Sequence, residues 1–233
     1  TSEYTLLSHE MPSVSDLLSS NPGAEKDVRK IEHKFFSASK RATKLYPGVM
    51  ETMAWLKGRG VELIAYTDSI TYWAIKRLKQ TGLDGVFDEV FMSEDDSIPV
   101  GLDIEKFRYF EDPSEYELKL SRQYSVPREL RKPNPNIVLH ILKERNLDPQ
   151  RVLFVGDSLF KDIGMANEAG VHSVYARYGD VRADDAYEKL RKVSHWSDEH
   201  IEEDKGDEIK PTYVLEKGIS DLICLGLWGN GHD

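Results

Sequence analysis

The chain has 233 residues, of which 39% are hydrophobic and 31% are charged, a composition typical of a soluble protein with one substantial core. Its 41 acidic and 31 basic residues give a net charge of −10, which argues against nucleic acid as a partner because the phosphate backbone would be repelled. No apolar run reaches the roughly 18 residues of a bilayer span, the N-terminus lacks the pattern of a secretory signal, and the single Cys224 excludes an internal disulfide framework. We therefore expect a cytoplasmic protein that has no membrane segment.

The first 46 residues carry helical patterning, as in DVRKIEHKFFSASKRATKLY (27–46), and contain no convincing buried strand. We expect residues 1–46 to form a small helical cap or accessory segment. The main domain would then occupy residues 47–233.

Beyond residue 46, short apolar runs rich in branched and aromatic residues alternate with stretches of helical spacing. The expected strands are residues 61–66, 86–92, 151–156, 171–176 and 212–215. One expected helix contains Met53; it would start after Pro47 and end at the glycines of KGRG (57–60). The alternation predicts an α/β fold, namely a Rossmann-like parallel sheet with helices on both faces.

Residues 94–131 interrupt this alternation. The segment is rich in charge, tyrosine and proline, and it is longer than the usual connection in a compact α/β fold. We expect an irregular insertion, which either flanks the functional site or forms an ordered excursion with little regular structure.

Two carboxylates follow the predicted strand at residues 151–156. In RVLFVGDSLFKD (151–162), Asp157 comes directly after the strand and Asp162 lies five positions later, about one helical turn into the next segment. Ligand sites of parallel α/β sheets lie beyond the carboxyl ends of the strands, and Mg²⁺ commonly uses one or two protein carboxylates together with waters and a substrate phosphate. Asp157 alone is equally well explained as the N-cap of a helix that begins near Ser158 or Leu159.

Two further positions suit a phosphate ligand. In VELIAYTDS (61–69), Thr67 comes directly after the predicted strand, and its hydroxyl can donate to a phosphoryl oxygen. In RELRKPNPNIVLHIL (128–142), Lys132 stands just before a proline-started helix, where an ammonium can neutralise phosphate charge. Taken singly, Thr67 is also explained as a helix cap and Lys132 as a solvated lysine. The combination of all three motifs is more specific than any one of them.

With these motifs in this order, the chain resembles the haloacid dehalogenase (HAD) superfamily of hydrolases, most of which are Mg²⁺-dependent phosphatases. The resemblance covers residues 46–177: Thr67 stands at the hydroxyl position of the family's second motif, KPNP matches the third at Lys132, and VGDSLFKDIGMANEAGV matches the fourth. The final KPTYVLEKGISDL (210–222) is similar to the family's last strand and helix.

The resemblance implies a role for each matched residue. Thr67, with Asp68 beside it, and Lys132 would bind the phosphoryl group, and Thr67 and Lys132 would act in catalysis. Asp157, with support from Asp162, would hold Mg²⁺. The implied function is that of a phosphatase acting on a small phosphorylated metabolite through an aspartyl-phosphate intermediate.

The family's nucleophile is missing from the expected place. It belongs to an Asp-x-Asp-Gly-Thr motif at the end of a central strand ahead of the second motif, whereas Asp16 and Asp27 neither follow an apolar strand nor have a second aspartate two positions later. We therefore expect that this chain lacks the nucleophile strand and is itself inactive or nearly so, while the parent protein is the hydrolase.

Other functions stay open at this point. A non-catalytic relative would bind a phosphorylated ligand or a protein partner, with residues 94–131 as its surface. Some relatives dehalogenate acids or transfer phosphoryl groups to other acceptors, and a shared fold does not separate these reactions. The residues that would select a substrate are equally open, since Tyr46, His33 and Lys34 either approach a site or coat a helix.

Overall fold

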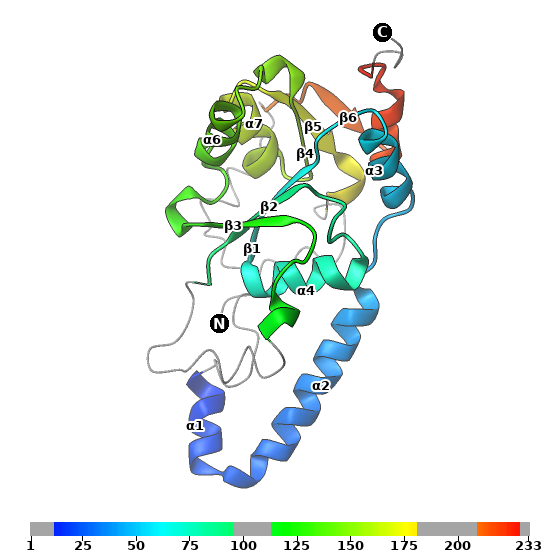
Figure 1. Cartoon of the computed structure of the whole chain (residues 1–233). Helices are drawn as coiled ribbons and strands as arrows, with labels where there is room; N and C mark the ends of the chain where they lie inside the picture. Colours follow the sequence, from blue (N-terminus) through cyan, green and yellow to red (C-terminus); the bar gives the residue numbers. More distant parts are fainter. Residues whose placement is uncertain (1–11, 96–112, 181–208, 229–233) are drawn as a thin grey trace. The chain divides into compact units, whose positions relative to one another are not determined.

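The structure, a computed structural model, describes residues 12–95, 113–180 and 209–228. The chain divides into two compact units, Thr1–Leu45 with Leu63–Ser125 and Tyr46–Glu62 with Val126–Asp233. The described strands form two three-stranded sheets, of order β1-β2-β3 and β4-β5-β6 (Figure 1). The α/β architecture expected from the alternating pattern is confirmed, and the domain boundary expected at residue 46 stays a prediction.

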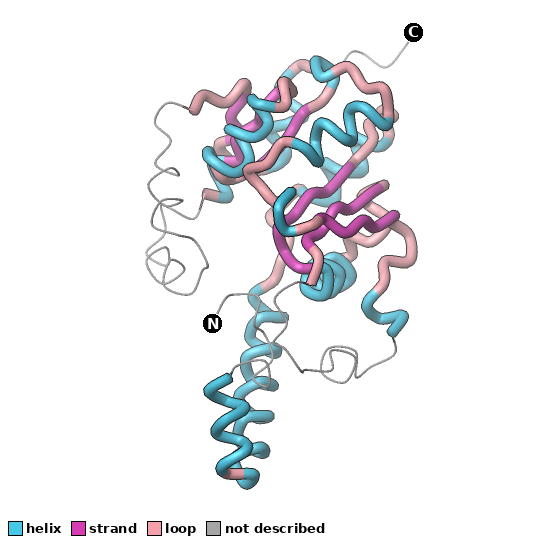
Figure 2. The backbone as a smooth tube through the Cα atoms, turned by 90° about the vertical axis from the view of Figure 1, so that its left-hand side faces the viewer, coloured by secondary structure: helices cyan, strands magenta, loops and turns pink. Residues whose placement is uncertain are grey.

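The first unit begins with two helices, α1 (Pro12–Ser20) and α2 (Glu25–Ala42), joined by the short turn η2 (Pro22–Ala24), as Figure 2 shows. The helical character expected of this region is therefore confirmed for its described part. Helix α2 buries no residue fully, and Phe35 is 54% exposed. Phe36 attaches the helix to α4 (Thr71–Thr81) by stacking on Trp73, with ring centroids 5.7 Å apart.

The sheet of the first unit is built on the parallel pair β1 (Ile64–Ile70) and β2 (Glu89–Ser93), in which Ile64 lies opposite Glu89. Every residue of β2 is buried, and Ala74 and Ile75 of α4 pack against Val90 and Met92. The helix therefore covers the sheet with its apolar side, as its spacing predicts.

The insertion contains a strand that the sequence pattern did not predict. Strand β3 (Arg122–Val126) adjoins β2, and in the sequence it is preceded by the 3₁₀ turn η3 (Pro113–Tyr116) and followed by the 3₁₀ turn η4 (Arg128–Leu130). The expectation of an irregular segment is thus wrong for residues 122–126, and residues 96–112 lie outside the described part. Four of the five β3 residues are exposed, so the strand has no apolar alternation to reveal it.

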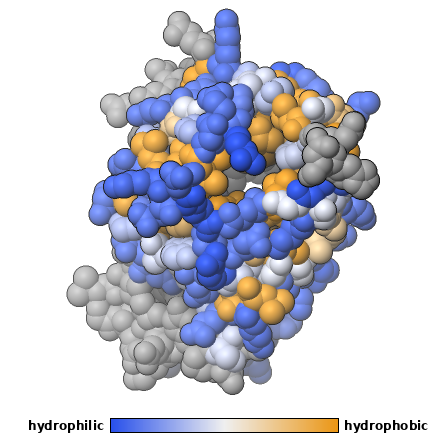
Figure 3. Space-filling model, turned by 45° about the horizontal axis from the view of Figure 1, so that its top comes forward, coloured by the Kyte–Doolittle hydropathy of each residue, from blue (hydrophilic) through white to orange (hydrophobic). Residues whose placement is uncertain are grey.

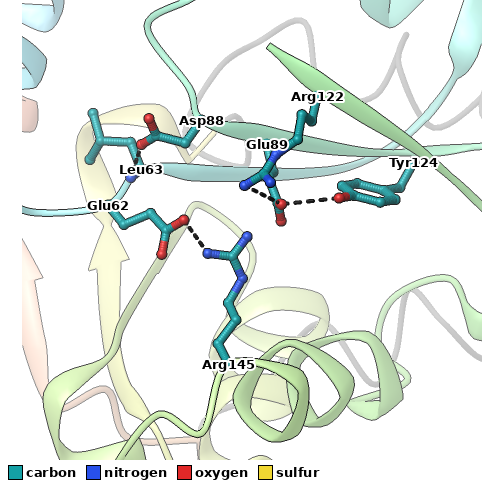
Figure 4. A network of polar contacts seen from close by, with 7 residues as sticks. All are labelled: Glu62, Leu63, Asp88, Glu89, Arg122, Tyr124 and Arg145. Carbon is teal, nitrogen blue, oxygen red and sulfur yellow. Dashed lines mark hydrogen bonds and ion pairs between the residues drawn. The ribbon is translucent and has the colours of Figure 1, made fainter.

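Polar contacts hold the insertion to β2 and to the turn before it. The buried Glu89 carboxylate accepts a hydrogen bond from the Tyr124 hydroxyl at 3.0 Å and pairs with Arg122 at 2.8 Å (Figure 4). The Asp84 carboxylate accepts three backbone N–H groups in succession at 2.8–3.1 Å, those of Lys119, Leu120 and Ser121.

The second unit contains the parallel strands β4 (Leu153–Gly156), β5 (His172–Ala176) and β6 (Tyr213–Leu215). Besides η4, its described helical elements are α3 (Val49–Lys57), α6 (Asn136–Glu144), η5 (Pro149–Arg151), the π-helical η6 (Leu159–Gly164), α7 (Met165–Glu168), η7 (Arg177–Gly179) and η9 (Ile219–Leu225). The core includes Ile163, Met165, Val174 and Leu215, each at most 1% exposed. An ion pair between Glu62 and Arg145 joins the segment after α3 to the end of α6 (Figure 4).

Across the described ranges, no helix combines the length and the apolar character of a membrane span. Figure 3 shows hydrophilic residues over much of the face in view, with hydrophobic residues in smaller groups between them.

Candidate functional site

The residues predicted to bind metal and phosphate in the second unit lie where two parallel strands end. Strand β4 ends at Gly156, directly before Asp157, and Gly156 lies opposite Tyr175 of β5. The segment that begins at Asp157 and the η7 turn after β5 therefore leave the sheet at the same edge. In parallel α/β sheets this is the edge at which ligands bind.

Lys132 and Asp162 form a buried ion pair at this edge. The Lys132 ammonium lies 2.8 Å from Asp162 Oδ1, and the two side chains are only 14% and 6% exposed. The other carboxylate oxygen of Asp162 accepts the backbone N–H of Ser158 at 3.1 Å. Both oxygens of Asp162 thus have protein partners, which compensates its burial and fixes the position of the lysine.

Gly156 is the position that lets Asp162 reach this place. A Cβ added at residue 156 would lie 2.5 Å from Oδ2 of Asp162 and closer still to Cβ and Cγ. Real Cβ atoms essentially never come within 3.0 Å of such neighbours. The glycine is therefore required by close approach and not by an unusual backbone angle.

Asp157 lies in a different environment from Asp162. Its side chain is accessible to solvent, yet surrounding protein still raises the pKa of its carboxyl through burial, and the nearby Asp162 raises it further against the opposing effect of Lys132. An accessible but crowded carboxylate is suited to binding a cation. The alternative that Asp157 is the helix N-cap is wrong, because Ser158 occupies that place and its Oγ accepts the N–H of Lys161 at 3.1 Å.

The turn after β5 adds residues that the sequence motifs did not indicate. A Cβ added at Gly179 would lie 3.3 Å from Asp157 Cβ, so this turn packs against the aspartate. Asp180 contributes to the raised pKa of Asp157, and its carboxylate accepts a hydrogen bond from the Tyr175 hydroxyl. The sequence carried one overlooked signal here, since Asp180 follows a predicted strand closely, as Asp157 does.

Thr67 and Asp68 belong to the first unit. They lie within β1 and not after it, because the strand continues to Ile70 with a register irregularity between Thr67 and Ile70. The alternative that Thr67 caps the next helix is wrong: the N-cap of α4 is Ile70, and the Thr67 hydroxyl accepts the N–H of Ser69 at 3.1 Å. The phosphate-binding roles of Thr67 and Asp68 stay predictions.

The donor set at Asp157 suits a hard cation. Within the described ranges no three His, Cys, Asp or Glu side chains converge on one point. Mg²⁺ needs no such cage, because it keeps several waters and commonly uses one or two carboxylates. Asp162 lies close enough to Asp157 to raise its pKa, and Lys132 opposes this effect. A divalent cation bound at Asp157 would relieve the repulsion between the two carboxylates.

Comparison with known sequences identifies the family. A family model described as haloacid dehalogenase-like hydrolase matches residues 14–170, and a second, described as HAD-hydrolase-like, matches residues 129–217. The first range is more than half of the 233 residues and includes Thr67, Lys132, Asp157 and Asp162.

Similar characterised proteins include several phosphatases. A glyceraldehyde 3-phosphate phosphatase of Methanopyrus kandleri is 28% identical over 58% of this chain and 45% of its own length, and phosphoglycolate phosphatase 1 of Pseudomonas aeruginosa is 27% identical over 62% and 41%. The chain thus spans less than half of either relative. Among solved structures, the putative HAD-hydrolase YfnB from Bacillus subtilis, bound to magnesium, aligns over 91% of this chain and 68% of its own with 17% identity and a TM-score of 0.49. Because the first family model spans most of the motifs and more than half of the sequence, this chain belongs to the haloacid dehalogenase-like hydrolases.

Proposed function

We propose that the parent protein is a Mg²⁺-dependent phosphatase of small phosphorylated metabolites. The observation that carries the proposal is the pairing of a buried, fully compensated Asp162 with Lys132, next to an accessible Asp157. A purely structural role would not require one paired, buried aspartate next to one accessible aspartate, because a helix cap or a solvated lysine tolerates many substitutes. Family membership and the phosphatases among the similar proteins support the same reaction class.

Each residue then has a distinct task. Asp157 would hold Mg²⁺, which supplies charge neutralisation and orientation of the phosphoryl oxygens. Asp162 would act as a positioning residue, because both of its oxygens are engaged by Lys132 and Ser158. Lys132 would stabilise the charge of the phosphoryl group, and Thr67 with Asp68 would contribute hydrogen bonds to it.

We also propose that the 233 residues alone do not catalyse turnover. No Asp-x-Asp sequence follows an apolar strand ahead of Thr67, so the aspartate that serves as the nucleophile in the family has no counterpart there. The described strands give independent support, since β1 and β4 each pair with a described strand on one side only. The β4 residues Leu153, Phe154 and Val155 are apolar and partly buried, a composition that edge strands usually avoid. A further strand beside β1 or β4 would explain why β4 has an apolar, partly buried composition.

The test measures phosphate release in the presence and absence of Mg²⁺, over a panel of phosphate esters. The 233-residue chain is compared with the protein purified from its natural source, whose intact mass is measured against 26.7 kDa. We expect a larger natural protein with Mg²⁺-dependent activity and no turnover by the chain. Turnover by the chain that disappears in Asp157→Ala would refute the proposed inactivity, and a natural protein with no Mg²⁺-dependent release would refute the phosphatase assignment.

A second function is favoured by the same missing nucleophile. If the natural protein has the mass of this chain, a non-catalytic protein that binds a phosphorylated ligand becomes the better proposal. Lys132, Asp157 and Asp162 would then keep their binding roles without chemistry.

A further inference from the structure

Tyr178 lies beside Asp157, Tyr46 packs against Tyr178, and neither tyrosine has a part in the proposed chemistry. Tyr178 belongs to the η7 turn, directly before Gly179, which packs against Asp157. Tyr46 meets Tyr178 edge to face, with ring centroids 5.1 Å apart and an interplanar angle of 80°. Both tyrosines belong to the second unit, as does Asp157.

The pair is held in place from both sides. The Tyr46 carbonyl accepts the N–H of Val49 across the turn that starts α3, and Gly48 in this turn has a positive φ of 77° and packs against Ser220. On the other side, the buried Tyr175 hydroxyl donates to Asp180 at the end of the η7 turn. The two rings are therefore positioned by short, well-anchored segments.

The Tyr46 side chain nevertheless remains 54% exposed. An aromatic ring at a fixed position beside a phosphate site offers an apolar face for stacking and a hydroxyl for hydrogen bonding. Tyr178 is more enclosed than Tyr46: it is partly buried, and its phenol O–H is a hydrogen-bond donor for a ligand.

The charge around the pair restricts the ligand. Asp180 lies near Asp157 and Asp221 lies near Tyr178, whereas Arg177 of the same turn is paired with Glu216, so the charge on this side of the site is acidic on balance. A second anionic group on the substrate would be repelled here, whereas neutral hydroxyls would find phenol and carboxylate partners.

We infer that Tyr46 and Tyr178 select the organic part of the substrate, and that this part is a neutral, hydroxyl-bearing ring, as in a sugar phosphate, in preference to a short phosphorylated acid. The inference rests on the proposed function, because it assumes that phosphate binds at Lys132 and Asp157. The tyrosines are positioning and specificity residues in this scheme and take no part in bond breaking.

The test measures binding and not turnover, so it applies to the chain as it is. Dissociation constants for inorganic phosphate, glucose 6-phosphate and phosphoglycolate are measured by NMR titration in the presence of Mg²⁺. The variants are Tyr46→Ala, which removes the ring, and Tyr46→Phe, which removes only the hydroxyl. Phe35→Ala is the matched control, because Phe35 has the same 54% exposure and lies on α2 in the other unit.

We expect glucose 6-phosphate to bind more tightly than inorganic phosphate, and phosphoglycolate to bind no more tightly than inorganic phosphate. Tyr46→Ala should weaken glucose 6-phosphate about three- to tenfold and leave inorganic phosphate unchanged, and Tyr46→Phe should retain most of the affinity. Equal weakening of both ligands, no weakening, or the same loss in Phe35→Ala would overturn the inference alone. A wild-type chain that does not bind inorganic phosphate would overturn the proposed function and this inference with it.

Discussion

Replacing Gly156 by alanine tests whether the close approach of Asp162 to the end of β4 holds the site together. The added Cβ would lie well within 3.0 Å of Cβ and Cγ of Asp162, and these atoms are not the mobile end of a long side chain. Asp162 would have to move, and its bonds to Lys132 and to the Ser158 N–H would lengthen or break.

The expected loss of stability follows from two contributions. Overpacking of a dense interior costs about 1–3 kcal/mol, and weakened hydrogen bonds to a buried charged group add about 1.5–3 kcal/mol. We therefore expect Gly156→Ala to lower the free energy of unfolding by about 3–5 kcal/mol. With a urea m value of about 1–3 kcal/mol/M, the midpoint should fall by at least about 1 M.

Urea titration followed by tryptophan fluorescence measures this effect, because Trp55 and Trp228 lie in the same unit as Gly156, with ring centroids 6.0 Å apart. Gly164→Ala is the matched control: its added Cβ would meet neighbours only at 3.5 and 3.6 Å, in ordinary van der Waals contact. Since Gly164 has helical backbone angles, alanine there should be neutral or stabilising by up to about 1 kcal/mol. Unchanged midpoints in Gly156→Ala would refute the reasoning.

Three more predictions concern the carboxylates. Lys132→Met leaves the Asp162 charge without its partner and should lower the free energy of unfolding by about 3–5 kcal/mol in urea titrations. The double variant with Asp162→Asn should recover part of this loss, and losses that simply add would contradict the pairing. Burial and the nearby Asp162 raise the pKa of Asp157 above 3.8, so the metal-free folded state loses stability as pH rises from 3.8 through the raised folded-state pKa, and Asp157→Asn should be the more stable variant above that pKa. Mg²⁺ at ten times its dissociation constant should stabilise only the wild type, by about 1.4 kcal/mol. Equal stabilisation of both proteins would exclude Asp157 as a ligand. Burial raises the pKa of Asp84, but backbone hydrogen bonds from Lys119, Ser121 and Leu120 outweigh burial and lower this pKa below 3.8. The stability that the Asp84 carboxylate contributes is therefore present above pH 3.8 and is lost as pH falls through the folded-state pKa. Asp84→Ala should lower the free energy of unfolding by about 1–3 kcal/mol at pH 7, and a loss that persists undiminished at pH 2 would contradict this assignment.

The strands predicted from apolar runs are present within a few residues of their expected bounds, and the deviations have physical causes. Strand β1 begins at Ile64 and not at Val61, because the Val61 N–H still bonds the Leu56 carbonyl at the end of α3. It continues beyond Tyr66 because pairing with β2 extends to Ser93 despite the polar residues. Strand β3 has no apolar pattern at all and depends on partners distant in sequence, such as Glu89, which no local signal predicts.

The sequence motifs predict part of the candidate site. Spacing and resemblance indicate Lys132, Asp157 and Asp162, and the structure places these three residues in one unit and pairs Lys132 with Asp162, while their roles stay predictions. The η7 turn was missed because its relation to Asp157 depends on the parallel register of β4 and β5, which the sequence does not state. Sequence spacing also could not show which carboxylate is compensated by protein groups and which is left accessible.

The five-residue spacing of the two aspartates has its own structural explanation. Asp157 precedes the N-cap Ser158, so it lies outside the helical segment and a regular α-helical rotation does not relate its side chain to that of Asp162. The segment after Asp157 is instead a π-helical turn, in which the Ser158 carbonyl accepts the N–H groups of both Asp162 and Ile163 at 3.0 and 3.1 Å. This wider turn returns the Asp162 side chain to the Ser158 N–H and to the space left by Gly156. Single π turns occur frequently at functional sites, and here the turn pairs the Asp162 carboxylate with Lys132 while Asp157 stays exposed.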